Sequence, residues 1–314
     1  MKYSFVVAIF NDGWLAREFC MEFQRVFRQY LNTQGIEGTV ELIFVNDGSR
    51  IDSWQHLTEL VAEFPFVRTI DLSRNFGQHI ALSCGYMNAS GEFVGMLNVD
   101  MEDPPDQIPV LLDLIQKGDH DIVYGLREDR KSPWIESLTS KAFNLLLNKL
   151  TGHDLPLNIA TLRVMDRRFV DAYNSLTEKS RYIPGLEMWL GFRKGFAKIK
   201  HKQRAKGRSS YSFSKRLSMA IEAIISFSDL PLRWLVKFGF LVSFLGFVLG
   251  LYWLAQKILL PNVAAGFTST ITLIIFFAGV QIIVAGFAGL YIGRVLKEVQ
   301  NRPLYVIREK LNFA

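Results

Sequence analysis

Residues 67–103 read VRTIDLSRNFGQHIALSCGYMNASGEFVGMLNVDMED. The apolar runs at 67–72 and 92–98 have the length and composition of buried strands, and residues 78–88 between them have helical periodicity. A strand, a helix and a second strand in this order predict two parallel strands joined by a crossover helix. The segments that follow the two strands are polar, and parallel sheets bind their ligands at these carboxyl ends.

The same alternation continues on both sides of this unit. We expect further strands at 3–10, 40–46 and 121–124, and further helices at 14–31, 52–63, 107–116, 137–150 and 166–175. Repeated alternation predicts an α/β fold in which a mostly parallel, doubly wound sheet is covered by helices on both faces. The loops that follow the strands are therefore where we expect the site.

The last third of the chain has a different composition. Between residues 230 and 296 there is no Asp or Glu, residues 238–255 carry no charge, and Gln281 is the strongly polar residue of 271–291. Each apolar stretch is long enough to cross a hydrocarbon core of roughly 30 Å. Two such stretches in succession predict a transmembrane hairpin, although two buried helices of a soluble protein would have the same composition.

Positive charge is concentrated beside these stretches. The chain has a net charge of +6, and residues 193–216 hold ten Lys or Arg, with lysine or arginine alternating from Lys198 to Arg208. A basic cluster beside apolar spans favours anionic lipid or a phosphorylated ligand, and we expect no nucleic-acid partner. Basic flanks on both sides place both termini in the cytoplasm, with the hairpin in the inner membrane.

These patterns divide the chain into five segments. We expect a cytoplasmic domain at 1–210, an amphipathic interfacial helix at 211–232, transmembrane helices at 233–260 and 268–293, and a cytoplasmic C-terminal segment at 294–314.

The acidic loop after the strand at 92–98 is the strongest candidate for a metal site. Asp100 and Glu102 alternate, so in an extended loop they face one point, and carboxylate oxygens suit Mg²⁺ or Mn²⁺. Such a cation would neutralise a diphosphate leaving group. We interpret Asp103 differently, as the N-cap of a helix that Pro104 and Pro105 begin.

Two other loops carry candidate ligands. Asp47, in a turn that also contains Gly48, can bind a base or ribose, although a plain turn has the same composition. Arg74 can pair with a phosphate, and the helix that begins after it would offer free N–H groups to an anion. His79 has no partner cluster in the sequence, so we interpret it as a solvated helix residue.

Together these segments resemble the family 2 glycosyltransferases with the GT-A fold, and in particular the branch that glycosylates polyprenyl phosphates. The resemblance covers nearly the whole chain. It is carried by the motifs at 6–12, 45–49, 74–77, 100–105, 125–127, 204–211 and 227–232. The family resemblance implies a Rossmann-like, mostly parallel GT-A domain followed by a two-helix transmembrane hairpin.

The resemblance also implies roles for particular residues. The nucleotide-sugar would be bound by Ala8, Phe10, Asp12, Asp47, Arg74, Asn98 and Asp100. The cation would be bound by Asn98, Asp100 and Glu102, and the catalytic residues would be Asp100, Arg127 and Arg163. The acceptor phosphate would be held by Arg127, Arg163, Arg204, Ser209 and Tyr211.

Three positions depart from the family pattern. Asn98 stands where the family has the first acid of Asp-x-Asp, and Glu102, where the family has Gln, can restore the charge. Thr161 replaces the acid of Asp-Phe-Arg-Leu, whereas Arg163 is retained. The loss of that acid is compatible with catalysis, because a phosphomonoester has a second pKa of about 6 and needs no general base to deprotonate it at neutral pH.

The implied reaction is in-line attack of a polyprenyl phosphate oxygen on the sugar C1, with inversion, using a UDP-linked donor. The resemblance also implies a homo-oligomer, specifically a tetramer. Two alternatives stay open. A processive polysaccharide synthase shares the catalytic fold, but its Gln-x-x-Arg-Trp motif and its additional spans are missing from the sequence. A catalytically degenerate scaffold subunit would explain Asn98.

Overall fold

The structure is a computed structural model, and it describes residues 2–35, 37–127, 156, 158–200, 230–259 and 266–313. The chain divides into two compact units. The first consists of Met1–Ser212 together with Pro303–Ala314, and the second consists of Phe213–Arg302.

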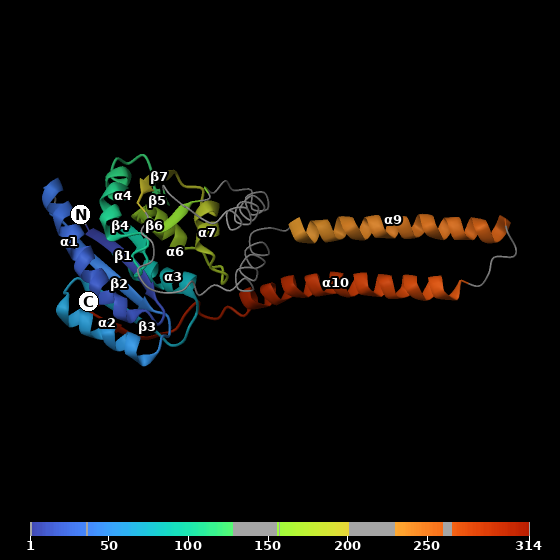
Figure 1. Ribbon diagram of the computed structural model, residues 1–314, viewed down its shortest axis with the longest axis horizontal. Helices are drawn as coiled ribbons and strands as arrows, with labels where there is room; N and C mark the ends of the chain where they lie inside the picture. The colour runs from blue at the N-terminus through green and yellow to red at the C-terminus, as the bar shows by residue number, and fades with distance from the viewer. Residues whose placement is uncertain are drawn as a thin grey trace. The chain divides into compact units, whose positions relative to one another are not determined.

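The described residues of the first unit form an eight-stranded sheet with the order β7-β5-β6-β4-β1-β2-β3-β8 (Figure 1). The strands are β1 (Lys2–Ile9), β2 (Thr39–Asn46), β3 (Val67–Leu72), β4 (Phe93–Leu97), β5 (Ile122–Arg127), β6 (Ile159–Asp166), β7 (Lys194–Ile199) and β8 (Ile307–Leu311). Strands β1 to β4 are parallel to one another, whereas β6 is antiparallel to both β4 and β5, and β8 is antiparallel to β3. The predicted α/β fold with a mostly parallel sheet is confirmed, and the two antiparallel strands are additions to it.

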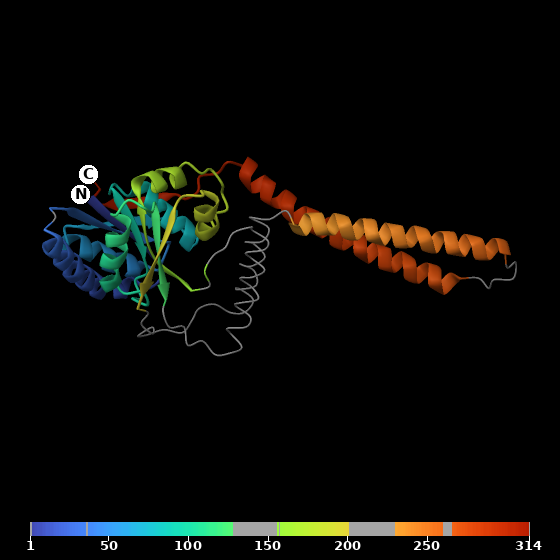
Figure 2. The ribbon, with the colours of Figure 1, turned by 90° about the horizontal axis from the view of Figure 1, so that it is seen from above.

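Helices cover both faces of this sheet (Figure 2). They are α1 (Ala16–Gln34), α2 (Ile51–Glu63), α3 (Gln78–Asn88), α4 (Ile108–Ile115), α6 (Arg167–Asn174) and α7 (Ile183–Trp189), with short 3-10 turns at Gly13–Leu15 and Pro105–Gln107. The bounds of α1, α2, α3, α4 and α6 lie within a few residues of the predicted ones, whereas α7 has no predicted counterpart. The predicted helix at 137–150 and nearly all of the predicted interfacial helix at 211–232 lie outside the described residues.

The apolar spacing of the helices explains how each one packs. Helix α1 buries Phe19, Phe23 and Phe27, which are four residues apart, and the ring of Phe23 meets Phe5 of β1 with 5.2 Å between centroids. Helix α3 lies on the opposite face, where Gly85 allows close approach. A Cβ at Gly85 would lie 2.1 Å from Cγ1 of Val6.

The second unit contains two long helices, α9 (Leu230–Leu259) and α10 (Phe267–Val299). By length and composition, Leu235–Tyr252 and Phe276–Val299 could each cross a membrane, and none of the residues described in these two windows is buried inside the chain. Phe240 and Phe247, for example, are mostly exposed. A pair of core helices in a soluble protein would instead bury such side chains.

After α10 the chain returns to the first unit. Strand β8 adds to the edge of the sheet, with Thr69 opposite Leu311 and Asp71 opposite Glu309. The C-terminal strand therefore lies beside β3. Our division of the sequence gave residues 294–314 as one separate segment, whereas in the structure the first unit includes the chain from Pro303 onward.

Candidate functional site

The loops that carry the predicted donor-binding residues lie at one edge of the sheet. Strands β4, β1, β2 and β3 are neighbours and run parallel, so their carboxyl ends lie together. The residues that these ends bring to the same edge are Ala8, Phe10, Asp12, Asp47, Arg74, Asn98 and Asp100. Ala8 is half-buried near the end of β1, and Phe10 and Asp12 beyond it are exposed.

The loops after β1 and β2 are bonded to each other. The backbone N–H of Asn11 donates to Oγ of Ser49 at 2.9 Å, and the N–H of Arg50 donates to Oδ1 of Asn11 at 3.1 Å. Asn11 and Gly48 have positive φ values of 62° and 61°, in the left-handed region that asparagine and glycine tolerate best. The two loops therefore form one hydrogen-bonded unit.

Asp47 points into the protein. Its two carboxylate oxygens accept the backbone N–H groups of Phe76 and Gly77, at 2.7 and 2.9 Å, and the residue is buried. Burial raises the pKa of Asp47, while these two N–H groups and Arg74 oppose that rise. The expectation that the N–H groups before α3 are free for an anion is therefore wrong for Phe76 and Gly77, because Asp47 already accepts from both.

Arg74 remains at the surface of this edge. Its guanidinium lies 4.1 Å from the centroid of the Phe76 ring, and Nη1 donates to the carbonyl of Asn75 at 3.0 Å. Stacking on Phe76 orients the guanidinium without neutralising its charge.

The acidic loop after β4 has a turn at Met101, whose φ is 55°. The N–H of Glu102 donates to Oδ1 of Asp100 at 3.2 Å. The Asn98 amide donates from Nδ2 to Oγ1 of Thr161 at 3.1 Å, and its Oδ1 accepts from Nε2 of Gln78 at 3.4 Å. The side chain of Asn98 thus connects the acidic loop to β6 and α3.

Asp103 does not cap a helix, which corrects our interpretation. The helical turn begins at Pro105, and no side chain caps it. Instead the buried carboxylate of Asp103 accepts two hydrogen bonds from Arg127, both 2.9 Å, and one from the N–H of Thr161 at 2.9 Å. Nη2 of Arg127 also lies 3.8 Å from Oε2 of Glu102. Asp103 therefore ties the acidic loop to β5 and β6.

The donor set of this loop fits a hard divalent cation that is completed by substrate. Asp100 and Glu102 supply two carboxylates, and the described residues contain no group of three or more His, Cys, Asp or Glu side chains that could hold a metal ion by themselves. Mg²⁺ commonly binds one or two carboxylates and takes its other ligands from substrate phosphates and water.

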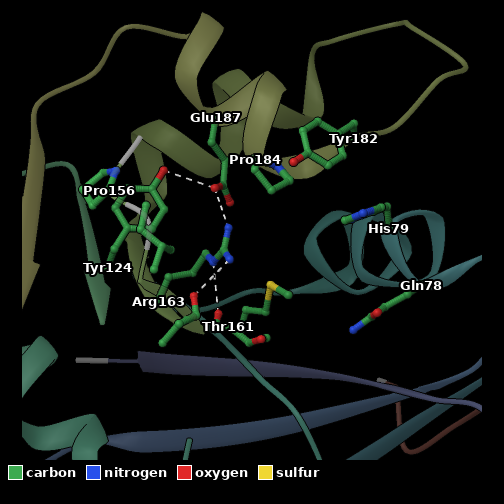
Figure 3. Close-up of a pocket in the computed structure, with 12 residues that line it drawn as sticks. Gln78, His79, Tyr124, Pro156, Thr161, Arg163, Tyr182, Pro184 and Glu187 are labelled. Atoms are coloured by element: carbon green, nitrogen blue, oxygen red, sulfur yellow. Dashed lines mark hydrogen bonds and ion pairs between the residues drawn. The ribbon is translucent and has the colours of Figure 1, made fainter. Parts of the chain in front are cut away.

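The first unit contains a pocket of about 300 Å³ (Figure 3). It is lined by Gln78, His79, Met96, Tyr124, Pro156, Ile159, Ala160, Thr161, Arg163, Tyr182, Pro184 and Glu187. Gln78 and Thr161 belong to this lining and are both bonded to Asn98. The pocket and the acidic loop are therefore parts of one site.

A buried ion pair forms one wall of the pocket. Nη1 of Arg163 lies 2.5 Å from Oε2 of Glu187, and the hydroxyl of Tyr124 donates to the same oxygen at 3.1 Å. Glu187 is fully buried, and its Oε1 has no partner among the described residues. Burial raises the pKa of Glu187, and the guanidinium of Arg163 works in the opposite direction.

Within the described part of the chain, Arg163 has hydrogen-bonding capacity that no partner uses. It donates from Nε to the carbonyl of Thr161, from Nη2 to the carbonyl of Ala160 and from Nη1 to Glu187. These bonds use three of the five N–H groups of a guanidinium. Arg163, which is predicted to be catalytic and to bind phosphate, is buried and paired with Glu187, and it lines the pocket.

His79 also lines the pocket, so our interpretation of it as a solvated helix residue is wrong. Its ring meets Tyr182 edge-on with 5.5 Å between centroids, and Nδ1 has no partner among the described residues. Burial, and to a smaller extent Arg163, lowers the pKa of His79 to about 4. The imidazole is therefore neutral at neutral pH.

No pattern in the sequence indicates a role for Tyr124, Tyr182 or Glu187 in the site. Glu187 lies in α7, far along the chain from the predicted motifs, and the tertiary fold brings it to Arg163. Three predicted phosphate-binding residues, Arg204, Ser209 and Tyr211, lie outside the described residues.

Residues 5–173 match the protein family described as glycosyl transferase family 2. The prophage-derived bactoprenol glucosyl transferase of Shigella flexneri is 32% identical, over 98% of this chain and 98% of its own length. The undecaprenyl-phosphate 4-deoxy-4-formamido-L-arabinose transferase of Proteus mirabilis is 30% identical, over 98% of this chain and 93% of its own. Among solved structures, glucosyl-3-phosphoglycerate synthase from Mycobacterium tuberculosis, in complex with Mn²⁺, uridine-diphosphate-glucose and phosphoglyceric acid, is 16% identical. That match has a TM-score of 0.49 and covers 72% of this chain and 78% of that chain.

Proposed function

The chain belongs to glycosyl transferase family 2, and we propose that it transfers a sugar from a UDP-linked donor to polyprenyl phosphate, with inversion at C1. The names of two relatives that match nearly the whole chain support this acceptor, since one is a bactoprenol and the other an undecaprenyl-phosphate transferase. The product would be a polyprenyl-phosphate sugar for modifying cell-envelope glycans.

One observation supports the donor part of the proposal. Asn98, in the same loop as the two acids, is hydrogen-bonded to Gln78 and Thr161, and both of these residues line the pocket. In this proposal Asp100 and Glu102 hold Mg²⁺ or Mn²⁺ against the diphosphate, with Asn98 beside them. A cation bound there would neutralise the charge of the departing nucleoside diphosphate. The pocket takes the sugar, and Oε1 of Glu187, which has no partner in the described ranges, accepts from a sugar hydroxyl.

The remaining donor contacts come from the loops after β1, β2 and β3. We assign the nucleoside to Ala8, Phe10, Asp12 and the turn at Asp47, and a phosphate to the exposed guanidinium of Arg74. Asp47 serves this role by holding Phe76 and Gly77 in place.

The acceptor needs charge and orientation more than a base. Its phosphate is largely dianionic at neutral pH, so the attacking oxygen is already deprotonated, and Thr161 can stand where relatives of this branch have an acid. We propose that the phosphate accepts from the N–H groups of Arg163 that its carbonyl and Glu187 partners leave unused, with Arg127 holding the acidic loop beside it. Arg204, Ser209 and Tyr211 complete the proposed phosphate site.

We propose that the two apolar helices anchor the chain in the bilayer that contains the lipid acceptor. The chain leaves the first unit before α9 and rejoins it at β8 after α10, so two crossings would return it to the side on which it began. We propose that this side is the cytoplasmic face of the inner membrane, because the basic residues flank the spans. We also propose that the chain forms a homo-oligomer, specifically a tetramer.

Transfer to a defined lipid tests the proposal. The purified full chain is incubated with undecaprenyl phosphate and a panel of nucleotide-sugars, with and without EDTA, and the lipid is analysed by mass. We expect one sugar per lipid from one UDP-linked donor and loss of transfer in EDTA. Asp100→Asn should lower kcat by about a hundredfold, whereas Asp119→Asn, on the surface of the same domain, should not.

The other outcomes separate the alternatives. The absence of product with every donor would favour a scaffold subunit, and a long polymer would favour a processive synthase. Full activity in EDTA together with full activity of Asp100→Asn would remove the cation from the proposal.

A further inference from the structure

Arg308 lies on the C-terminal strand β8, far along the chain from the loops assigned to the donor. We infer that Arg308 is a positioning residue for donor binding. It holds the proposed nucleotide-binding loops in place through its hydrogen bond to the buried carboxylate of Asp71. This inference rests on the proposed function, because it takes those loops to be the donor site.

Two hydrogen bonds attach Arg308 to the end of β3. Nη1 donates to Oδ2 of Asp71 at 3.0 Å, and Nη2 donates to the carbonyl of Ser73 at 2.9 Å. The N–H of Ser73 in turn donates to the carbonyl of Val306 at 2.9 Å. Ser73 immediately precedes Arg74, so the C-terminal strand holds the base of the loop that carries the proposed phosphate ligand.

Asp71 passes this constraint to the neighbouring loop. It is 1% exposed, and its Oδ1 accepts from Nδ2 of Asn46 at 2.7 Å. Asn46 is also 1% exposed and ends β2, and its Oδ1 accepts from the N–H of Ser49 at 3.4 Å. Oγ of Ser49 accepts from the N–H of Asn11 in the loop after β1. A chain of hydrogen bonds thus runs from Arg308 to three loops of the proposed donor site.

Loss of the Arg308 side chain would disturb this series of hydrogen bonds at the buried carboxylate of Asp71. Removal of the guanidinium, whose side chain is 61% exposed, leaves Oδ2 of Asp71 without this partner. Water then replaces the guanidinium or the carboxylate moves, and a movement would displace Oδ1 and the Asn46 amide that donates to it. Residues that orient the ligand-binding side chains commonly affect the affinity for the ligand, although they do not contact it. Arg163, to which we assign the acceptor phosphate, takes part in none of these bonds, so we expect the effect to fall on the binding of the nucleotide.

The test compares Arg308→Ala and Arg308→Lys with wild type in the full chain. We expect Arg308→Ala to raise the donor KM about tenfold, with the acceptor KM and kcat within about twofold of wild type. Arg308→Lys keeps a charge for Asp71 but cannot bond both partners in the same fork, so its donor KM should be intermediate. Glu309→Ala, an exposed neighbour on β8, is the matched control and should behave as wild type.

The readout distinguishes positioning from a loss of folded protein, because a smaller active fraction lowers the maximal rate but leaves KM unchanged. A folded Arg308→Ala with the wild-type donor KM would overturn the inference. If Arg308→Ala does not fold, Arg308→Lys decides in the same way, and a wild-type donor KM for that variant would overturn the inference.

UDP binding by calorimetry separates this inference from the proposed function. A wild-type chain that binds UDP but transfers no sugar would refute the function alone, and weaker UDP binding by Arg308→Ala would then still support the positioning role. A wild-type chain that transfers sugar, with UDP binding unchanged in Arg308→Ala, would refute the positioning role alone. A wild-type chain that neither binds UDP nor transfers sugar would refute both.

Discussion

His79, Arg163 and Glu187 line one pocket but differ in their charge states. Arg163 and Glu187 neutralise each other across 2.5 Å, so both can be buried as ions. His79 has no acid partner there, and burial together with the nearby Arg163 favours its neutral form. The ion pair therefore adds little net charge to the pocket wall, so the wall suits an uncharged sugar ring, and a phosphate bound there would depend on the remaining N–H groups of Arg163.

The depressed pKa of His79 predicts how stability depends on pH. The folded-state pKa is about 4 and the ordinary value is 6.5, so the unfolded chain binds the proton more readily, and stability falls as the pH drops from 6.5 towards 4. Between pH 7 and pH 5 wild type should lose about 2 kcal/mol through this residue. His79→Gln should lack that loss, which melting temperatures of both proteins at the two pH values will measure.

His56→Gln is the matched control, because His56 lies exposed on α2. It should lose as much stability between the two pH values as wild type does. An equal loss in His79→Gln would show that the imidazole is not held neutral in the folded protein.

For individual residues, the local sequence indicates candidates for the site but not the contacts that the tertiary fold creates. Asp100 and Glu102 are predicted to face one point because they alternate in an extended loop, but the loop turns at Met101, where φ is 55°, and the contact between the two residues is the Glu102 N–H donating to Oδ1 of Asp100. Glu187 could not be predicted, because nothing near it in the sequence indicates that α7 packs against β6 at Arg163. Asp103 was misassigned because a capping aspartate and one that binds an arginine have the same local sequence.

At the scale of the structural elements, the turn after β2 is packed closely against the segment after β3. A Cβ at Gly48 would lie 2.2 Å from the carbonyl carbon of Arg74 and 2.4 Å from the backbone N of Asn75. These are backbone atoms, so a rotamer change cannot relieve the contact. Gly48 also has a φ of 61°, which costs any other residue about 1 kcal/mol or more.

Gly48→Ala should therefore separate the loops after β2 and β3. We expect a loss of about 2–4 kcal/mol, combining left-handed strain with the backbone contact, and a higher donor KM. Thermal unfolding and transfer kinetics measure the two effects.

Gly35→Ala supplies the control. Gly35 has nearly the same φ, 64°, but a Cβ there would meet nothing within 4 Å. It should cost about 1 kcal/mol with no change in donor KM. Equal effects of the two substitutions would contradict the close packing of Gly48 against Arg74.

The strands differ in how well their sequence predicts them. β3 and α3 were predicted with the bounds they have, because their apolar residues are buried in the pattern of a strand and a helix. β8 was missed because three of its five residues, Arg308, Glu309 and Lys310, are charged and exposed. An edge strand of this kind is stabilised by backbone hydrogen bonds to its neighbour, so its sequence need not contain the alternation of apolar residues that predicts a strand.

For the whole molecule, β8 constrains any path through a membrane. The first and last described strands, β1 and β8, belong to one sheet, and α9 and α10 lie between them in the chain. A folded sheet cannot be split across a bilayer, so the chain must cross an even number of times. Two crossings place the segment between α9 and α10 on the side opposite the sheet.

Cysteine labelling measures this directly, because the two native cysteines, Cys20 and Cys84, are buried and should give little background. Ala264→Cys places a thiol between the two helices in sequence, whereas Lys117→Cys places one on the surface of the first unit. With a membrane-impermeant maleimide on spheroplasts, Ala264→Cys should be labelled before lysis and Lys117→Cys only after it. Arg302→Cys, just beyond α10, should behave as Lys117→Cys does. If Ala264→Cys and Lys117→Cys were labelled under the same conditions, the helices would not cross, and a lipid phosphate would need another route to the pocket.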